Sequence, residues 1–211
     1  MPRKTIIVLA AACLGIAAAL ALVTMIVVQG RGETHAGTAG QAIEAGVEGQ
    51  PTAGGPFTLI NQDGETVDET LLDGKWSLVF FGFTYCPDYC PTTLAFLKAM
   101  QAELGAQGDD LQMIFVSVDP ARDTPGVLKD YLSSDGFPEG VIGLTGTPDQ
   151  IAAAARAYNV FYSKSGEGEA YTMNHSLAIW LMGPDGKARQ TLNYELGPDR
   201  AADIVRRVMA R

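Results

Sequence analysis

The sequence predicts an α/β domain with a central mixed sheet flanked by helices, carried behind one N-terminal transmembrane helix. Three observations support this: a long apolar run near the start, strand-like runs that alternate with amphipathic segments after residue 57, and a hairpin pattern at each end of that series. Parallel strands need long crossover connections, whereas hairpins join antiparallel strands. The sheet should therefore contain both kinds of strand pair.

The N-terminal apolar run extends over residues 5–28 without a charge. As a helix it would span roughly 36 Å, enough to cross a bilayer, whereas the apolar part of a cleavable signal peptide has only about 7 to 15 residues. We therefore expect a retained anchor. Arg3 and Lys4 precede it, so the positive-inside rule keeps residues 1–4 in the cytoplasm. This predicts a single-pass inner-membrane protein whose soluble part faces the periplasm or an equivalent intermembrane compartment.

Residues 29–56 are rich in Gly, Ala and Thr and contain no aromatic residue, which predicts a flexible tether. The chain has a net charge of -9, and Arg3 and Lys4 are its only charged side chains before residue 31. The part outside the membrane is therefore acidic and should be repelled by nucleic acid and by anionic lipid surfaces. Nucleic acid is excluded as a partner, and the membrane is expected to be contacted through the N-terminal helix.

Residues 57–211 are expected to form one domain. FTLINQDGETV reads as a hairpin turned at Asp63 and Gly64, and residues 78–83 form an apolar run typical of a buried strand. Residues 91–104 have a proline near their start and apolar side chains at helical spacing. A buried strand should therefore run directly into an amphipathic helix.

The strand and helix alternation then continues to the end of the chain. The expected elements are a strand at 111–118, a helix capped by Asp123 or Thr124, a strand at 141–146, a helix at 147–158, a hairpin formed by 175–182 and 187–194, and a last helix within 197–211.

Two cysteines lie where the buried strand meets the helix, in FGFTYCPDYCPTTL. Cys86 follows the strand, and Cys90 enters the first helical turn, whose free N–H groups and positive dipole end favour a thiolate. Pro87 and Pro91 restrict the backbone around the pair. We expect both thiols to lie close together at one exposed site.

His175 is the histidine of the predicted domain, since His35 lies in the tether. It directly precedes an apolar strand, at a point where the chain could return beside the cysteines. Two thiolates and one imidazole suit copper, whereas a structural zinc site normally takes four ligands. Cys86, Cys90 and His175 are therefore the candidate ligands of one copper ion per chain, as Cu(I) or Cu(II), in an open site from which the metal can be passed on.

The sequence resembles the Sco/SenC family of copper chaperones of cytochrome c oxidase assembly. Four segments match the family motifs in order: FGFTYCPDYCP, VSVDPARDTP, LTGTPDQIAAAARAYNVFY and YTMNHSLAIWLMGPDG. The resemblance implies a thioredoxin-like fold, copper bound by Cys86, Cys90 and His175, and delivery to the dinuclear copper centre of the oxidase. It also implies a copper-receiving oxidase subunit and a copper-loading chaperone as partners. Asn174 departs from the family, where an Asp often precedes the histidine and could hold the second imidazole nitrogen.

Other functions remain open alongside this copper carrier, which would not be an enzyme. A membrane-anchored thiol-disulfide reductase acting on oxidase cysteines would use Cys86 and Cys90 as its redox-active pair and would need no histidine. Such reductases generally place a proline opposite their cysteines, and none occurs between Pro148 and Pro184. A copper or redox sensor could use the same three residues. A structural disulfide would close a very short loop and stabilise the fold little.

Residues flanking the motifs have simpler interpretations. Asp119, Arg122 and Asp123 are expected to form a strand-end loop with a helix cap and an ion pair. Nearby aromatic and methionine side chains are expected to pack rather than to bind metal: Phe83, Tyr85, Met113 and Met173.

Overall fold

A computed structural model of the chain describes residues 53–211. The predicted cytoplasmic residues 1–4, the transmembrane anchor at 5–28 and the tether up to residue 52 lie outside this range. Across residues 53–211, none of the helices combines the length and the apolar character that crossing a membrane requires.

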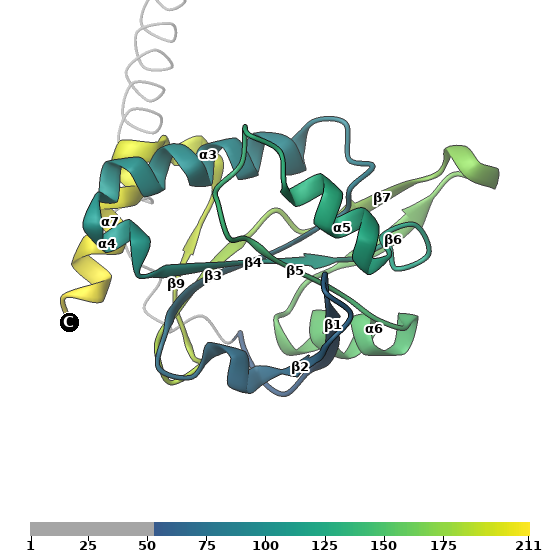
Figure 1. Ribbon diagram of the computed structural model, residues 1–211, viewed down its shortest axis with the longest axis horizontal. Coiled ribbons are helices and arrows are strands. Elements are labelled where there is room, and N and C mark those ends of the chain that lie inside the picture. Colours follow the sequence, from purple (N-terminus) through teal and green to yellow (C-terminus); the bar gives the residue numbers. More distant parts are fainter. Residues whose placement is uncertain (1–52) are drawn as a thin grey trace, which may run out of the picture. The chain divides into compact units, whose positions relative to one another are not determined.

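The described residues form an α/β fold whose elements follow the predicted order (Figure 1). The strands are β1 Thr58–Asn61, β2 Thr66–Asp68, β3 Trp76–Gly82, β4 Leu111–Ser117, β5 Ile142–Thr145, β6 Tyr162–Ser165, β7 Thr172–His175, β8 Ile179–Met182 and β9 Ala188–Leu192. The α-helices are α3 Tyr89–Leu104, α4 Ala106–Asp109, α5 Pro125–Leu132, α6 Pro148–Ala157 and α7 Pro198–Met209.

The main sheet is mixed, as predicted. Its strand order is β2-β1-β5-β4-β3-β8-β9, in which β3, β4 and β5 run parallel and the outer pairs are antiparallel. Figure 1 shows α3, α5 and α7 on one side of the sheet and α6 on the other. β3 lies between β4 and β8, and its residues are buried from Ser77 to Gly82. The segment that leads to the cysteines is therefore fixed in the centre of the fold.

The helix that follows the cysteines is held by its predicted apolar stripe. The four apolar side chains of this stripe are all buried: Leu94, Leu97, Met100 and Leu104. Helix α3 begins at Tyr89, two residues before the predicted start, so that Cys90 lies in its first turn as expected. At the start of α5 the capping side chain is Thr124, whose hydroxyl accepts the N–H of Val127, and not Asp123.

Two short strands were not predicted from the sequence. β6 and β7 pair antiparallel as a separate two-stranded ribbon, which extends from the body of the domain in Figure 1. None of the residues of either strand is fully buried. Their side chains therefore show no clear apolar alternation, which is the signal by which a strand is predicted. His175 ends this ribbon, so it lies on β7 and not at the entrance to β8.

The folded region also begins earlier than residue 57. Ala53 packs in the hydrophobic core, and its carbonyl accepts the N–H of Ala188. The N–H of Gly54 donates to the carbonyl of Ala157. Residues 53–56, which were assigned to the tether, thus belong to the domain. Backbone hydrogen bonds and one small side chain leave no hydrophobic pattern in the sequence. This explains why the predicted start of the domain lies at residue 57 and not at residue 53.

Candidate metal site

The loop that carries Cys86 is fixed by a buried carboxylate. Both oxygens of Asp123 accept hydrogen bonds: Oδ2 from the N–H of Thr84 and the hydroxyl of Ser117, at 3.1 and 2.6 Å, and Oδ1 from the hydroxyl of Thr84, at 2.6 Å. Asp123 is fully buried, and this burial raises the pKa of its carboxyl group. Thr84 is thereby tied to the loop that follows β4, two residues before Cys86.

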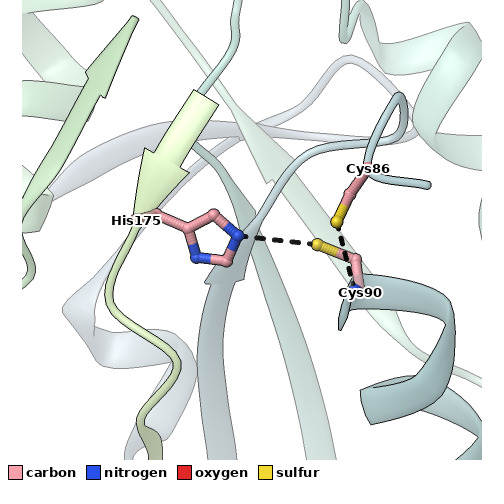
Figure 2. Close-up of side chains that lie close together, drawn as sticks. All are labelled: Cys86, Cys90 and His175. Carbon is pink, nitrogen blue, oxygen red and sulfur yellow. Dashed lines mark hydrogen bonds between the residues drawn. The ribbon is translucent and has the colours of Figure 1, made fainter. Parts of the chain in front are cut away.

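Cys86 takes the place of a capping side chain at the start of α3. Its Sγ accepts the N–H of Cys90 at 3.4 Å, so it pairs with one of the N–H groups that a helix leaves free at its first turn (Figure 2). The N–H of Cys86 in turn donates to the carbonyl of Phe83. The spacing of four residues therefore places one sulfur at the helix end and the other within its first turn.

Cys90 lies against the end of β3 at a glycine. A Cβ added to Gly82 would lie 2.8 Å from the Cys90 sulfur and 2.7 Å from Cε2 of Phe115. Real Cβ atoms do not approach other heavy atoms this closely, so any larger residue at this position would push the sulfur away. The glycine in FGF is therefore required by the close approach of α3 to the sheet, a role that its sequence position alone did not indicate.

His175 points from the end of β7 toward Cys90, as Figure 2 shows. Its Nε2 lies 3.8 Å from the Cys90 sulfur, and its Nδ1 lies 2.9 Å from the carbonyl oxygen of Ser176. Because a carbonyl can only accept, this contact places the ring proton on Nδ1 and leaves the Nε2 lone pair for a metal. The ring also packs edge-on against Phe83, with 5.8 Å between centroids.

The carbonyl of Ser176 therefore holds the second imidazole nitrogen, the role that the family pattern gives to an aspartate before the histidine. Asn174 is exposed, whereas His175 is half-buried, and successive side chains of a strand point to opposite faces. Residue 174 consequently faces away from the imidazole. A backbone carbonyl carries no side-chain signature, so this contact could not have been read from the sequence.

The two thiols differ in their protonation. The hydrogen bond from the Cys90 thiol lowers the pKa of Cys86 to about 3, with smaller contributions from the N–H groups of Cys90 and Asp88, and these outweigh the effect of burial. The same hydrogen bond and burial raise the pKa of Cys90. In the metal-free protein these shifts favour the negative charge on Cys86 and the proton on Cys90. No disulfide joins them.

The structure brings the three predicted ligands together. The two sulfurs and an imidazole nitrogen all lie within 4.8 Å of one another, and no other His, Cys, Asp or Glu of residues 53–211 joins the group. The prediction that both thiols face an exposed site is wrong, because Cys86 and Cys90 are 8% and 2% exposed. Exposure at the site comes from the half-buried histidine and from neighbouring side chains such as Tyr85.

The flanking residues show a mixed outcome. Phe83 and Met113 are buried as expected, and Met173 packs partly buried against the core. Tyr85 is 64% exposed and is therefore not a core residue. The predicted ion pair forms between Arg122 and Asp119.

This donor set is suited to a soft metal ion. Two sulfurs and one imidazole nitrogen are the ligands that copper accepts in its Cu(I) and Cu(II) states. A structural zinc site would normally need a fourth protein ligand, and the group contains three residues. Ligand atoms up to 4.8 Å apart can converge on one ion, and the thiolate of Cys86 is already in the metal-binding form.

Several named proteins are similar in sequence to this chain. A family model described as SCO1/SenC matches residues 45–210. The chain is 39% identical over 166 residues to Protein SCO1, mitochondrial, of Saccharomyces cerevisiae, a match that covers 75% of this chain and 56% of the yeast protein. It is 41% identical over 153 residues to Protein SenC of Rhodobacter capsulatus, covering 72% and 68% of the two chains. A match to Protein SCO1 homolog 1 of Arabidopsis thaliana spans 41% of that protein, so the chain covers about half the length of these mitochondrial relatives.

Solved structures agree in fold. Copper-bound yeast Sco1 superposes with a TM-score of 0.70 at 38% identity, covering 76% of this chain and 91% of that one. Copper-bound ScoI of Bradyrhizobium japonicum gives a TM-score of 0.67 at 40% identity, with 74% and 99% coverage. The domain thus has the thioredoxin-like fold of the Sco structures, and the chain belongs to the SCO1/SenC family.

Proposed function

We propose that this protein is a copper chaperone that binds one copper ion through Cys86, Cys90 and His175 and delivers it to the dinuclear copper centre of cytochrome c oxidase during assembly. The observation that carries the proposal is the convergence of two sulfurs and an imidazole nitrogen within 4.8 Å, with Nε2 of His175 at 3.8 Å from the Cys90 sulfur. Three protein ligands leave room for a ligand of the acceptor to enter before the others leave. Such a site favours transfer over permanent storage.

The relatives support copper as the cargo. The yeast and Bradyrhizobium structures are both described as having copper bound. A further similar structure, at 31% identity and a TM-score of 0.60 over 76% of this chain, is described as a member of the Sco family of cytochrome c oxidase assembly proteins. We extend both properties to this chain because its ligand residues have the required chemistry.

The proposed partners follow from this role. The copper-receiving subunit of cytochrome c oxidase takes the ion, and a copper-loading chaperone supplies it. Residues 5–28 are proposed to anchor the protein in the inner membrane as a single helix, with residues 29–52 as the tether. The domain then faces the periplasm or an equivalent intermembrane compartment, where it can reach an acceptor in the same membrane.

A second function is favoured by the two thiols themselves. The low pKa of Cys86 and the protonated Cys90 beside it are the arrangement of an attacking and a resolving thiol. A related structure is described in terms of a disulfide switch. The alternative is therefore a thiol-disulfide reductase that keeps the cysteines of the oxidase subunit reduced.

An anaerobic copper titration separates the two functions. The full chain, reduced and purified in detergent, is compared with His175→Ala, and bound copper per chain is measured together with the rate of disulfide reduction. One tightly bound copper ion, weakened in His175→Ala, supports the chaperone. If the unaltered protein binds no copper tightly and both proteins reduce disulfides equally well, the proposed function is refuted in favour of the reductase.

A further inference from the structure

The ribbon that carries His175 is attached to the hydrophobic core by two partly buried side chains, Tyr162 of β6 and Met173 of β7. β6 and β7 pair only with each other, and none of their residues is fully buried. At the base of the ribbon, backbone hydrogen bonding joins the N–H of Ser176 to the carbonyl of Phe161. This partial burial leaves the angle of the ribbon to the cysteines incompletely fixed, so polar contacts help to set that angle.

Such contacts come from Arg122, in the loop after β4. Its Nε donates to Oδ2 of Asp119, and its Nη1 donates to the carbonyl of Tyr171 at 3.0 Å. The hydroxyl of Tyr171 donates to Oδ1 of Asp119 at 2.7 Å, which closes the network. Tyr171 directly precedes β7, so this network holds the segment that leads to the histidine.

The same guanidinium also contacts the cysteine loop. Its central carbon lies 3.7 Å from the ring centroid of Tyr171 and 4.6 Å from that of Tyr85, the residue before Cys86. It also lies 6.0 Å from the centroid of Phe83, whose ring packs against His175. One side chain thus touches both ligand-bearing segments.

The charge pair at the centre of this network is partly shielded from water. The side chains of Arg122 and Asp119 are 16% and 4% exposed, so their interaction is stronger than that of a typical surface ion pair. A guanidinium can donate in its plane while its faces stack on aromatic rings, which a lysine ammonium cannot do. The position therefore requires arginine and not only positive charge.

We propose that Arg122 is a positioning residue of the metal site, which joins the cysteine loop to the histidine ribbon and sets the distance between their ligands before the metal enters. Its action is indirect, through Tyr85 on one side and Tyr171 on the other. The inference rests on the proposed copper-binding function, because the connection made by Arg122 would affect copper affinity and the arrangement of the copper ligands.

The test compares the unaltered full chain in detergent with Arg122→Gln, Arg122→Lys and Tyr171→Leu. Arg189→Gln is the matched control, because Arg189 also pairs with an aspartate but lies on β9, and that aspartate, Asp185, lies in the turn between β8 and β9. Copper affinity is measured by competition with a chelator, the ligands of Cu(II) by electron paramagnetic resonance, and the metal-free fold by thermal unfolding.

We expect Arg122→Gln to weaken copper affinity about tenfold or more, the range typical of groups that orient metal ligands. The resonance spectrum of bound Cu(II), which reports its nitrogen and sulfur ligands, should change as well. Arg122→Lys should show the same changes as Arg122→Gln. Tyr171→Leu should also weaken copper affinity and alter the spectrum. Arg189→Gln should match the unaltered protein.

Two outcomes would overturn the inference in different ways. If the unaltered protein binds copper and Arg122→Gln has the same affinity and spectrum, the positioning role is wrong while the proposed function stands. If the unaltered protein binds no copper, both fail. If Arg122→Gln does not fold, Tyr171→Leu is the test. An unchanged copper affinity and spectrum in that variant would equally contradict the positioning role of Arg122.

Discussion

The cysteine half and the histidine half of the metal site are built differently. Cys86 and Cys90 are buried between β3, an interior strand of the sheet, and the start of α3. His175 ends a two-stranded ribbon without a fully buried residue, held by two partly buried side chains, by hydrogen bonds and by Arg122. The thiols therefore depend on the core, and the imidazole depends on peripheral polar contacts.

This difference indicates that the two halves of the site have different roles in the proposed metal transfer. Burial in a packed core fixes the two sulfurs, since displacement of a core group costs several kcal/mol. Motion of a ribbon attached by hydrogen bonds costs less, because such contacts open locally. The imidazole is thus the ligand expected to leave first when copper passes to an acceptor.

The largest effect should come from the cysteine half. Cys90→Ser replaces a soft sulfur by a hydroxyl that stays protonated and is a poor ligand for copper. Copper affinity should fall by more than about a hundredfold, above the range for outer-shell partners. Chelator competition measures this. Retention of tight, stoichiometric copper would refute the site.

A smaller effect is expected from the histidine half. His175→Ala should weaken copper binding by at least about tenfold, yet leave Cys86 a thiolate at pH 7, because the Cys90 hydrogen bond contributes most to its low pKa. The alkylation rate of metal-free Cys86 by iodoacetamide should therefore change little. A large loss of thiol reactivity in this variant would show that the two halves are not independent.

Gly82→Ala tests how firmly the core holds Cys90. The added methyl group would meet the Cys90 sulfur and the ring of Phe115, and such overpacking costs about 1 to 3 kcal/mol. Urea unfolding should show this loss, together with weaker copper binding. Gly126→Ala in α5 is the control, because its Cβ would meet no atom within 4 Å. Equal stability of the two variants would contradict the close contact.

Most of the fold could be predicted from apolar patterns. The buried strand before the cysteines, the stripe of α3 and the two hairpins follow hydrophobic periodicity, which reflects burial directly. The β6–β7 ribbon could not be predicted in this way, because its residues stay partly exposed. Ala53 was likewise missed, since backbone hydrogen bonds fix it in place.

The site shows the same division. The ligands could be identified because cysteine and histidine are rare in this chain and have few alternative roles. Their supports could not, since Ser176 acts through its carbonyl, and Asp123 looks like a helix cap but holds Thr84. Arg122 was assigned to an ion pair, which is correct but incomplete. Its contacts with Tyr85 and Tyr171 join segments that are far apart in sequence.

The smallest effect is expected at Asn174, the departure from the family pattern. Residue 174 faces away from the imidazole, whose Nδ1 already donates to the Ser176 carbonyl. Asn174→Asp should therefore change copper affinity less than about twofold, well below the loss expected for a partner that orients the ligand. Chelator competition at fixed salt concentration measures this, with Asn174→Ser as a neutral control. A tenfold gain in the Asp variant alone would mean that a carboxylate at this position reaches the histidine, and that the ribbon rearranges when copper binds.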